Sequence, residues 1–245
     1  MEKNLEKYLD YLVEWIKEEV HKAKADGVIV GISGGIDSAV VSLLAKKAFP
    51  NNYLTVWMPC NSSQMDYDCV EELINNNQLV NVTVDLGTTY KELELNLIKT
   101  KVNLDKLALA NSRARLRMTT LYALGQSKKY LVLGTDNLDE WHIGYFTKFG
   151  DGGVDLLPIS GLLKREVKKA GEILGVPKSI IERKPTAGLW ENQTDESEIG
   201  FSYDVIDDYL DNKEVVKEAK IRIEQLHNVS EHKRIGAPKP KRFKE

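Results

Sequence analysis

The stretch that decides the fold is residues 28–38, VIVGISGGIDS. Its first five residues are apolar and mostly β-branched, which is typical of a strand buried on both faces of a parallel sheet. Its glycines allow a turn in which backbone N–H groups approach an anion, and the N-terminus of a following helix would add a favourable dipole. The stretch therefore predicts a buried strand, a phosphate-binding turn and a helix over residues 38–48.

Similar short apolar runs recur along the first half of the chain and predict three more strands, at residues 53–58, 80–86 and 130–133. Helical spacing of apolar residues predicts further helices at residues 5–23, 66–78 and 104–126. The first of these helices is expected to end at Asp26-Gly27, with Gly27 in the left-handed position. This alternation predicts an α/β fold, a three-layer Rossmann-like sandwich with a central parallel sheet and right-handed crossovers.

The second half of the sequence differs from the first in composition and in its pattern of apolar residues. Residues 134–161 are rich in glycine and predict a long functional loop. Extra C-terminal helices are expected at residues 164–174, 197–210 and 213–226, with a polar loop at residues 184–196. Because no repeat, flexible linker or low-complexity tract interrupts the chain, we expect residues 1–245 to form a single domain.

Composition excludes several classes of protein. The 245 residues carry 34 Lys and Arg against 37 Asp and Glu, a net charge of −3, which argues against a nucleic-acid binder. The mean hydropathy of −0.35 and the lack of a long apolar run predict no membrane span, and the N-terminus lacks the apolar stretch of a secretory signal. We therefore expect a cytoplasmic protein. The only two cysteines, Cys60 and Cys69, are too few for a disulfide scaffold and are expected to be structural.

The glycine loop does not match the two commonest phosphate loops. A Walker A loop would need a Gly-Lys pair, and the Rossmann fingerprint would need glycine where Ser33 stands. A plain strand-to-helix turn with Ser38 near the helix cap is the alternative. Asp37 favours the functional interpretation, because a carboxylate beside a phosphate creates repulsion unless a metal cation lies between them.

These residues carry a resemblance. Residues 33–38, SGGIDS, resemble the pyrophosphate loop of the N-type ATP pyrophosphatases, which include synthetases of NAD, GMP, asparagine and argininosuccinate and tRNA-modifying ligases. The resemblance implies an adenine nucleotide alpha-hydrolase-like fold, with the loop holding the β- and γ-phosphates of ATP. Oriented amides and a magnesium ion can stabilise the charge of a departing pyrophosphate.

Four further segments narrow the resemblance to the ammonia-dependent NAD synthetases: residues 111–118 (NSRARLRM), residues 134–155 (GTDNLDE followed by GYFTKFGDGGVD), residues 184–196 (KPTAGLW followed by QTDE) and residues 231–234 (EHKR). The implied reaction is the last step of NAD biosynthesis, in which ATP activates deamido-NAD as an acyl-adenylate and ammonia displaces AMP. Because the glycine loop starts about thirty residues into the chain, no N-terminal amidohydrolase (glutaminase) domain is expected. The family also implies a homodimer.

Residue roles follow from the resemblance alone. Asp37, Lys164 and Thr186 are the implied catalytic residues, and Asp37 and Glu140 the implied Mg²⁺ ligands. The implied contacts to ATP, a co-substrate, are Gly31, Ile32, Ser33, Gly34, Gly35, Ile36, Asp37, Ser38, Thr135, Lys164 and Thr186. The implied contacts to deamido-NAD are Arg115, Lys148, Asp155, His232 and Lys233.

Plainer interpretations stay open for some of these residues. The arginines of residues 113–117 could form a solvated helix face, Glu140 could be a surface acid, and the basic tail could be a solvated terminus. The role of Asp151 is left open, and His142 and His227 are expected to be structural. Another ligase of the superfamily, such as a GMP synthetase core or a tRNA-modifying ligase, is the first rival function. A non-catalytic nucleotide-binding module is the second.

Overall fold

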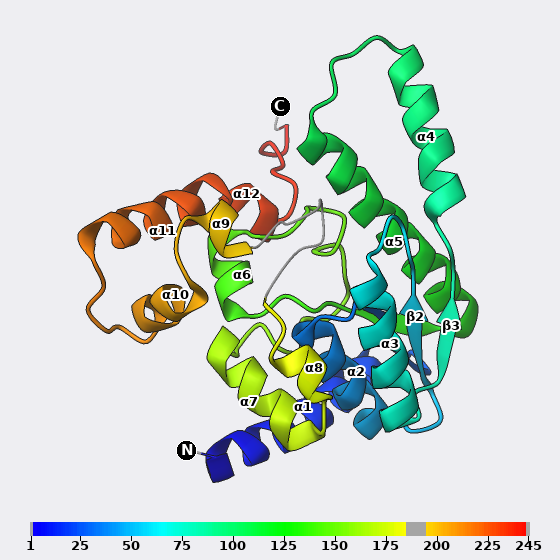
Figure 1. Ribbon diagram of the computed structural model, residues 1–245, viewed down its shortest axis with the longest axis vertical. Helices are drawn as coiled ribbons and strands as arrows, with labels where there is room; N and C mark the ends of the chain where they lie inside the picture. Colours follow the sequence, from blue (N-terminus) through cyan, green and yellow to red (C-terminus); the bar gives the residue numbers. More distant parts are fainter. Residues whose placement is uncertain (1, 185–194, 244–245) are drawn as a thin grey trace.

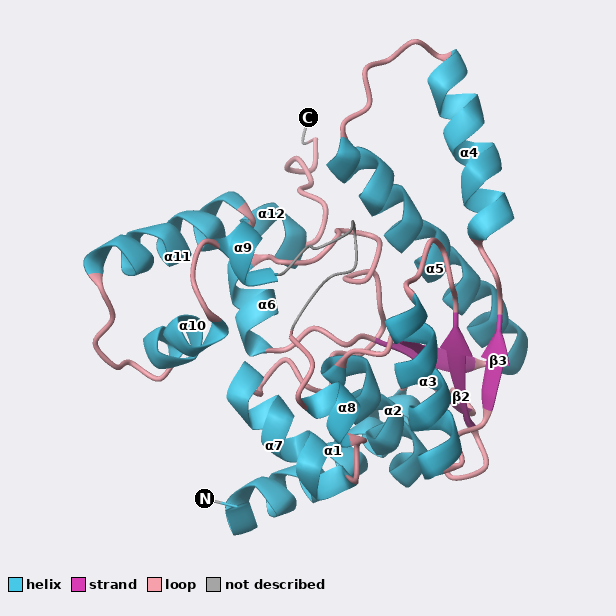
Figure 2. Ribbon diagram, viewed as in Figure 1, coloured by secondary structure: helices cyan, strands magenta, loops and turns pink. Residues whose placement is uncertain are grey.

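Four parallel strands form one sheet. The computed structural model describes residues 2–184 and 195–243. The strands stand in the order β3-β2-β1-β4, with these bounds: β1 Gly27–Ile32, β2 Tyr53–Trp57, β3 Asn81–Thr83 and β4 Tyr130–Leu133. Of these, β2 and β3 are labelled at the lower right of Figures 1 and 2. All three strand pairings are parallel, so the carboxyl ends of the strands meet at one edge, where the glycine loop begins.

Helices surround the sheet and continue beyond it. In the described residues they are α1 Glu2–Lys22, α2 Ile36–Ala48, α3 Gln64–Asn77, α4 Gly87–Lys99, α5 Lys106–Lys128, α6 Leu138–Ile143, α7 Lys164–Leu174, α8 Lys178–Ile181, α9 Asp195–Ile199, α10 Tyr203–Leu210, α11 Lys217–Val229 and α12 Glu231–Arg234. Within the described ranges, every helix is too short or too polar to cross a bilayer.

Strand β1 shows why the sheet is covered on both faces. Its side chains alternate, so Val28, Val30 and Ile32 join the core formed with α1, α2, α3 and α7, whereas Ile29 joins the core beneath α5. Burying one such side chain contributes about 1.5–3 kcal/mol. A strand that is apolar at every position is stable only where helices pack against both faces of its sheet. The predicted α/β fold with a central parallel sheet is confirmed.

The C-terminal helices form a third apolar cluster. It joins α6, α9, α10 and α11 through Ile143, Ile199, Tyr203, Ile206 and Ile223. Helix α10 also contacts α7, so this group of helices lies beside the strand edge that carries the glycine loop (Figure 1). The extra C-terminal helices therefore wall the site rather than extend the sheet.

The prediction for the end of the first helix is wrong. Helix α1 ends at Lys22, and Lys24 takes the left-handed conformation with φ 55°. Gly27 instead begins β1, where a Cβ would lie only 1.9 Å from the carbonyl oxygen of Asn52. Glycine is therefore needed there for close approach of the chain and not for a helix cap.

Three other element predictions need correction. The strand expected at residues 80–86 has only three residues, because Leu86 already caps the unpredicted helix α4. The helix expected at residues 197–210 is two helices, separated where Gly200 takes φ 98°. The glycine-rich stretch after β4 contains helix α6, which is only six residues long and has too few positions to show a periodic pattern.

Two histidines pack against each other between α6 and α11. The rings of His142 and His227 stack with centroids 4.2 Å apart, and Nδ1 of His227 lies 2.8 Å from the carbonyl oxygen of His142. Burial lowers the pKa of His142 to about 4, and the nearby His227 and Arg234 act in the same direction. His142 is therefore neutral in the folded protein at neutral pH.

This pair predicts a loss of stability in mild acid. The pKa of His142 is lower in the folded state than its ordinary value of about 6.5, so the unfolded chain binds more protons as the pH falls from about 6.5 to about 4. Because the ring is only half-buried, we expect a loss of about 1–2 kcal/mol over that range. Urea unfolding at several pH values should show a flatter profile for His142→Phe than for the wild type. Parallel profiles would contradict the assignment.

Candidate active site

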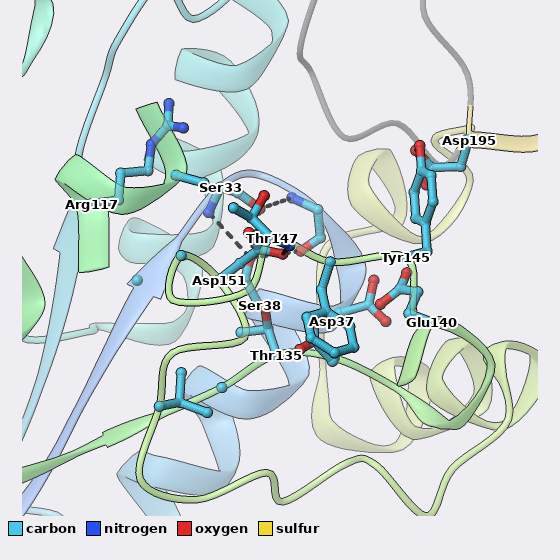
Figure 3. Close-up of a pocket in the computed structure, with 18 of the residues that line it drawn as sticks. Ser33, Asp37, Ser38, Arg117, Thr135, Glu140, Tyr145, Thr147, Asp151 and Asp195 are labelled. Atoms are coloured by element: carbon cyan, nitrogen blue, oxygen red, sulfur yellow. Dashed lines mark hydrogen bonds between the residues drawn. The ribbon is translucent and has the colours of Figure 1, made fainter. Parts of the chain in front are cut away.

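A cavity of about 650 Å³ opens at the carboxyl edge of the sheet, next to the ends of β1 and β4. Its wall includes the glycine loop, the segment after β4, residues of the 144–154 loop and the start of α7. Figure 3 shows labelled side chains of the glycine loop, of the segment after β4 and of the 144–154 loop around one space. Parallel α/β proteins bind ligands at this edge, because the loops there leave the sheet in a crevice.

The glycine loop is tied by its own two serines. The N–H of Ser33 donates to Oγ of Ser38 at 3.1 Å, the N–H of Gly35 donates to Oγ of Ser33 at 3.2 Å, and the Ser38 hydroxyl donates to the carbonyl of Gly35 at 3.0 Å. Gly34 has φ 79°, which strongly favours glycine. Gly35 is the N-cap of α2 and gives its first N–H groups no side-chain acceptor. These amides are available to an anion such as phosphate.

The plain-turn interpretation of the loop placed Ser38 near the helix cap. Ser38 lies in the first turn of α2 and bonds to the loop rather than capping the helix. Of the eight loop residues implied to contact ATP, all but Gly34 line the cavity, as do Thr135 and Lys164. Thr186 lies outside the described residues.

Two acidic side chains and one lysine form the centre of the site. Nζ of Lys164 lies 2.6 Å from Oδ2 of Asp37 and 3.0 Å from Oε1 of Glu140, and the lysine side chain is only 3% exposed. Asp37 and Glu140 point toward each other from α2 and α6 (Figure 3). Asp37 and Lys164 are 127 positions apart in the sequence. The topology of the sheet brings them together with Glu140.

The charges of this triad are strongly coupled. Burial opposes the charge on Lys164, but the carboxylates of Asp37 and Glu140 outweigh it and raise the pKa of the ammonium. Burial raises the pKa of Glu140 to about 7, although the ammonium of Lys164 acts against this shift. Glu140 is therefore not the surface acid of the plainer interpretation. Two carboxylates facing one ammonium leave the site with an attraction for further positive charge.

Asn137 fixes the carboxylates of Asp37 and Glu140 relative to each other. It is the N-cap residue of α6, and its Oδ1 accepts the N–H of Glu140 at 3.0 Å. Its Nδ2 donates to Oδ1 of Asp37 at 2.8 Å. One fully buried amide thus fixes the acid of α6 against the acid of α2.

A pair of buried aspartates fixes the start of α7. The N–H of Lys164 donates to Oδ2 of Asp139 at 2.9 Å and to Oδ1 of Asp207 at 3.0 Å. Burial raises the pKa of Asp139 to about 9, helped by its hydrogen bond to Asp207. Asp139 is therefore protonated at neutral pH, and the two side chains anchor the backbone from which the lysine reaches the site.

The donor set suits a hard divalent cation. Asp37 and Glu140 offer carboxylate oxygens, and no group of three or more His, Cys, Asp or Glu side chains in residues 2–184 and 195–243 could hold a metal by itself. Mg²⁺ binds in this manner, through one or two carboxylates with phosphates and water completing its shell. The two residues therefore fit a cation that arrives together with a nucleotide.

Two tyrosines link the acidic centre to the C-terminal helices. Oη of Tyr203 lies 3.0 Å from Oε1 of Glu140 and 3.1 Å from Oδ2 of Asp195. Oη of Tyr145 lies 3.1 Å from Oδ1 of Asp195 and 2.6 Å from Oε2 of Glu198. The sequence analysis missed this network, because single tyrosines in helical or loop segments carry no local signal.

Four of the five residues implied to contact deamido-NAD lie together. Nη2 of Arg115 donates to the carbonyl of Lys148 at 3.2 Å, and Nζ of Lys148 donates to the carbonyl of His232. Nζ of Lys233 donates to two carbonyls of the 144–146 segment at 2.7 and 2.8 Å and lines the cavity. The basic tail is therefore packed against the glycine-rich loop at these two positions.

The fifth residue, Asp155, stands apart from those four. Its Oδ2 accepts the N–H of Val132 at 2.8 Å and its Oδ1 accepts the hydroxyl of Tyr122 at 2.9 Å. The segment around it runs beside the end of β4, through an isolated bridge between Leu133 and Leu156. In this conformation Asp155 stabilises the sheet edge.

The arginines of residues 113–117 are not a uniformly solvated face. Arg117 is partly buried, lines the cavity and donates from Nε to the carbonyl of Met58 at 3.1 Å, while Arg113 stacks over the ring of Tyr90 at 5.5 Å. Arg115 is the exposed member. Alternate positions in a helix point in different directions, so the sequence pattern could not tell which arginine reaches the cavity.

Asp151 and Cys60 have structural contacts. Both carboxylate oxygens of Asp151 accept the N–H of Thr147 at 3.2 Å, which closes the glycine-rich turn.

Burial raises the pKa of the Cys60 thiol, so this cavity-lining group is protonated at neutral pH and is a poor nucleophile.

The comparisons with known proteins agree with each other. The family model described as NAD synthase matches residues 8–237. The NH(3)-dependent NAD(+) synthetase of Mesoplasma florum is 60% identical over 240 residues, which cover 98% of each chain. The NMN synthetase structure from Francisella tularensis superimposes with a TM-score of 0.91 at 41% identity, covering 96% of this chain and 98% of that one. The NH3-dependent NAD synthetase structure from Campylobacter jejuni superimposes with a TM-score of 0.80 at 25% identity, covering 97% and 99%.

The parallel sheet, the glycine loop at its carboxyl edge and the acidic pair beside that loop define an α/β protein with a site suited to a phosphate-bearing ligand, and the relatives that the chain matches are synthetases. The family is then settled by the match over almost the whole length. The chain belongs to the NAD synthase family.

Proposed function

We propose that this chain is an ammonia-dependent NAD synthetase, which converts deamido-NAD, ATP and ammonia into NAD, AMP and pyrophosphate. The observation that carries the proposal is the Asp37–Lys164–Glu140 triad, placed beside a phosphate-suited loop in a member of the NAD synthase family. A GMP synthetase core is not favoured, because the relative at 60% identity is a synthetase of NAD and the solved structure at 41% identity is a synthetase of NMN.

The first step activates a carboxylate that ammonia cannot attack. A carboxylate oxygen of deamido-NAD attacks the α-phosphorus of ATP, the bond to the β-phosphate breaks, and pyrophosphate leaves. The amides of the glycine loop face the departing charge, and Lys164 can turn from the acidic pair to the phosphates. Thr135 lines the same wall as the loop and is the proposed additional contact to ATP.

In the second step ammonia attacks the acyl carbon and AMP departs with the electron pair of the broken bond. Ammonia is itself the nucleophile, so no covalent bond to the protein is needed, and the buried, protonated thiol of Cys60 agrees with this. The protein contributes position, charge and exclusion of water. The proposed contacts to the dinucleotide are Arg115, Lys148, Asp155, His232 and Lys233.

Asp37 and Glu140 are the proposed ligands of Mg²⁺. When bound, this ion would neutralise charge on the triphosphate and on the leaving pyrophosphate. The carboxylates supply the hard oxygen donors, and Asn137 keeps them at the required separation.

A homodimer remains a proposal as well. It is supported by the arm formed by α4 and α5, which projects from the sheet in Figure 1. This arm and its connecting loop expose several large apolar side chains, namely Leu95, Ile98, Val102 and Leu107, which are 46–63% exposed. Patches of this kind mark interaction surfaces. The single domain and the cytoplasmic location stay predictions.

One observation favours a second candidate. The Francisella tularensis structure is named an NMN synthetase and superimposes better than the Campylobacter jejuni NAD synthetase. The same chemistry would then act on nicotinic acid mononucleotide, which lacks the adenylate half of the dinucleotide. The two functions share the activation chemistry and differ only in what fills the distal part of the substrate site.

Turnover with both acceptors tests the proposal. Purified protein with ATP, Mg²⁺ and ammonium should form one AMP for each NAD, and oxygen-18 in the substrate carboxylate should appear in AMP. We expect kcat/KM for deamido-NAD to exceed that for the mononucleotide by about tenfold or more, because the adenylate half adds binding contacts. The reverse ratio would establish the second candidate. AMP formation with neither acceptor would contradict both.

A further inference from the structure

Arg183 joins the glycine loop to α3, and neither the sequence motifs nor the mechanism above uses it. Its Nη1 donates to the carbonyl of Gly34 at 3.3 Å, and its Nη2 donates to Oδ1 of Asp66 at 2.6 Å. The arginine side chain is 14% exposed and the aspartate 16%, and both line the cavity. A planar guanidinium can make two such bonds in fixed directions, which a lysine cannot.

Both ends of this contact are firmly held. Asp66 belongs to the capping box at the start of α3, where its Oδ2 accepts the N–H of Ser63 at 2.8 Å. Arg183 follows α8, which is anchored in the core by the fully buried Ile180. The guanidinium is therefore a rigid support for whatever it touches on the loop.

Such a support matters for the central peptide of the loop, because glycine limits the rotation of a peptide less than any other residue does. The peptide bond between Gly34 and Gly35 is flanked by two residues without a Cβ, so rotating it by half a turn meets little steric resistance. In a trans peptide the C=O and the following N–H point in opposite directions. Here the carbonyl of Gly34 faces Arg183, and the N–H of Gly35 faces the hydroxyl of Ser33 at 3.2 Å.

The direction of this peptide decides the charge that the loop shows to a ligand. Ser33 and Gly35 line the cavity, whereas Gly34 does not. The N–H of Gly35 thus points to a side chain of the cavity wall, the hydroxyl of Ser33, whereas the oxygen belongs to Gly34, a residue outside that wall, and faces the guanidinium of Arg183. After a flip, a carbonyl oxygen would face a triphosphate, and an attractive dipole would become a repulsive one.

We propose that Arg183 is a positioning residue for the phosphate loop, which holds the Gly34 carbonyl away from the cavity so that the Gly35 amide serves the triphosphate. The proposal rests on the proposed function, since it assigns the loop to the pyrophosphate end of ATP. Asp66 is part of the same device, because it keeps the guanidinium in place when no nucleotide is bound.

The test measures three ligands by calorimetry on the full chain: inorganic pyrophosphate, α,β-methylene ATP and AMP, each with Mg²⁺. Arg183→Met removes both bonds while keeping an unbranched side chain. We expect about 10- to 100-fold weaker binding of pyrophosphate and of the ATP analogue, by similar factors, because each loses a correctly aimed charge-assisted contact. AMP should bind as to the wild type. In turnover, KM for ATP should rise more than kcat falls.

Two more variants separate positioning from charge and from general stability. Arg183→Lys keeps the charge but not the two fixed directions, and most of the loss should remain. Arg222→Met removes an exposed arginine of α11 and should leave all three affinities unchanged. Full recovery in Arg183→Lys would overturn the positioning role, as would a lower melting temperature with unchanged pyrophosphate affinity in Arg183→Met.

The same experiment keeps this inference apart from the proposed function. An active wild type with unchanged pyrophosphate affinity in Arg183→Met would refute the role of Arg183 and leave the synthetase assignment intact. A wild type that binds neither pyrophosphate nor the ATP analogue would refute both.

Discussion

Replacing Asp37 by asparagine is expected to lower kcat by about 10³-fold or more without unfolding the protein. The amide keeps the shape of the side chain and can still accept the hydrogen bond from Asn137. It removes the negative charge that, with Glu140, attracts a cation to the triphosphate. Loss of a preorganised electrostatic contact in a water-poor site costs orders of magnitude in rate. Stopped assays of AMP and NAD, with circular dichroism of the variant, measure both parts of this expectation.

The matched control is Asp68→Asn on α3. Asp68 is an exposed carboxylate that accepts a hydrogen bond from Gln64, and it lies away from the acidic pair. The same chemical change there should leave kcat within about twofold of the wild type, as most surface substitutions do. If Asp37→Asn kept a tenth or more of the wild-type activity, its proposed role in holding the cation would be wrong.

The beginning of the fold could be predicted because its signals are local. In residues 28–38 the strand, the turn and the helix each leave a mark within a few positions: β-branched apolar residues, glycines and a helix start. Helix α4 left no such mark, because only Tyr90 is buried on it and its other apolar residues are partly or largely exposed. A helix without a buried stripe has no period to detect.

Site residues could be predicted only where they lie within a sequence motif of the family that the chain resembles. The resemblance pointed to Asp37, Glu140 and Lys164, and parallel strand order explains why segments after β1 and β4 meet. Tyr203 and Arg183 could not be found in this way. Tyr203 reaches Glu140 across 63 positions and Arg183 reaches Gly34 across 149, and neither residue stands in a pattern that distinguishes it from an ordinary helix or loop residue.

The ammonium of Lys164 occupies the oxygens that a divalent cation would bind. The variant Lys164→Met is therefore expected to change how tightly the site binds metal. In the free protein the ammonium of Lys164 contacts both Asp37 and Glu140, so an incoming divalent cation competes with it for the same oxygens. Methionine fills nearly the same space without charge. Two carboxylates then face each other unpaired in a buried site, and a cation relieves their repulsion.

Lys164→Met is therefore expected to show two opposite effects. Its kcat should fall by about 10²–10³-fold, because a positive charge beside the phosphates is lost. In the absence of nucleotide, its affinity for Mn²⁺, a paramagnetic substitute for Mg²⁺, should rise by about tenfold, and saturating metal should raise its melting temperature more than that of the wild type. Electron paramagnetic resonance titration measures the affinity for Mn²⁺ directly and does not depend on turnover.

A variant that only damaged the fold could not produce this pair of results, since a disordered site would lose metal affinity along with activity. Lys168→Met serves as the control: Lys168 lies one turn further along α7 and lines the same cavity, but in the part of the chain that the structure describes it forms no ion pair with Asp37 or Glu140. Unchanged or weaker Mn²⁺ binding by Lys164→Met would show that the lysine does not compete with the metal. The proposed competition between the ammonium of Lys164 and the cation for Asp37 and Glu140 would then have to be abandoned.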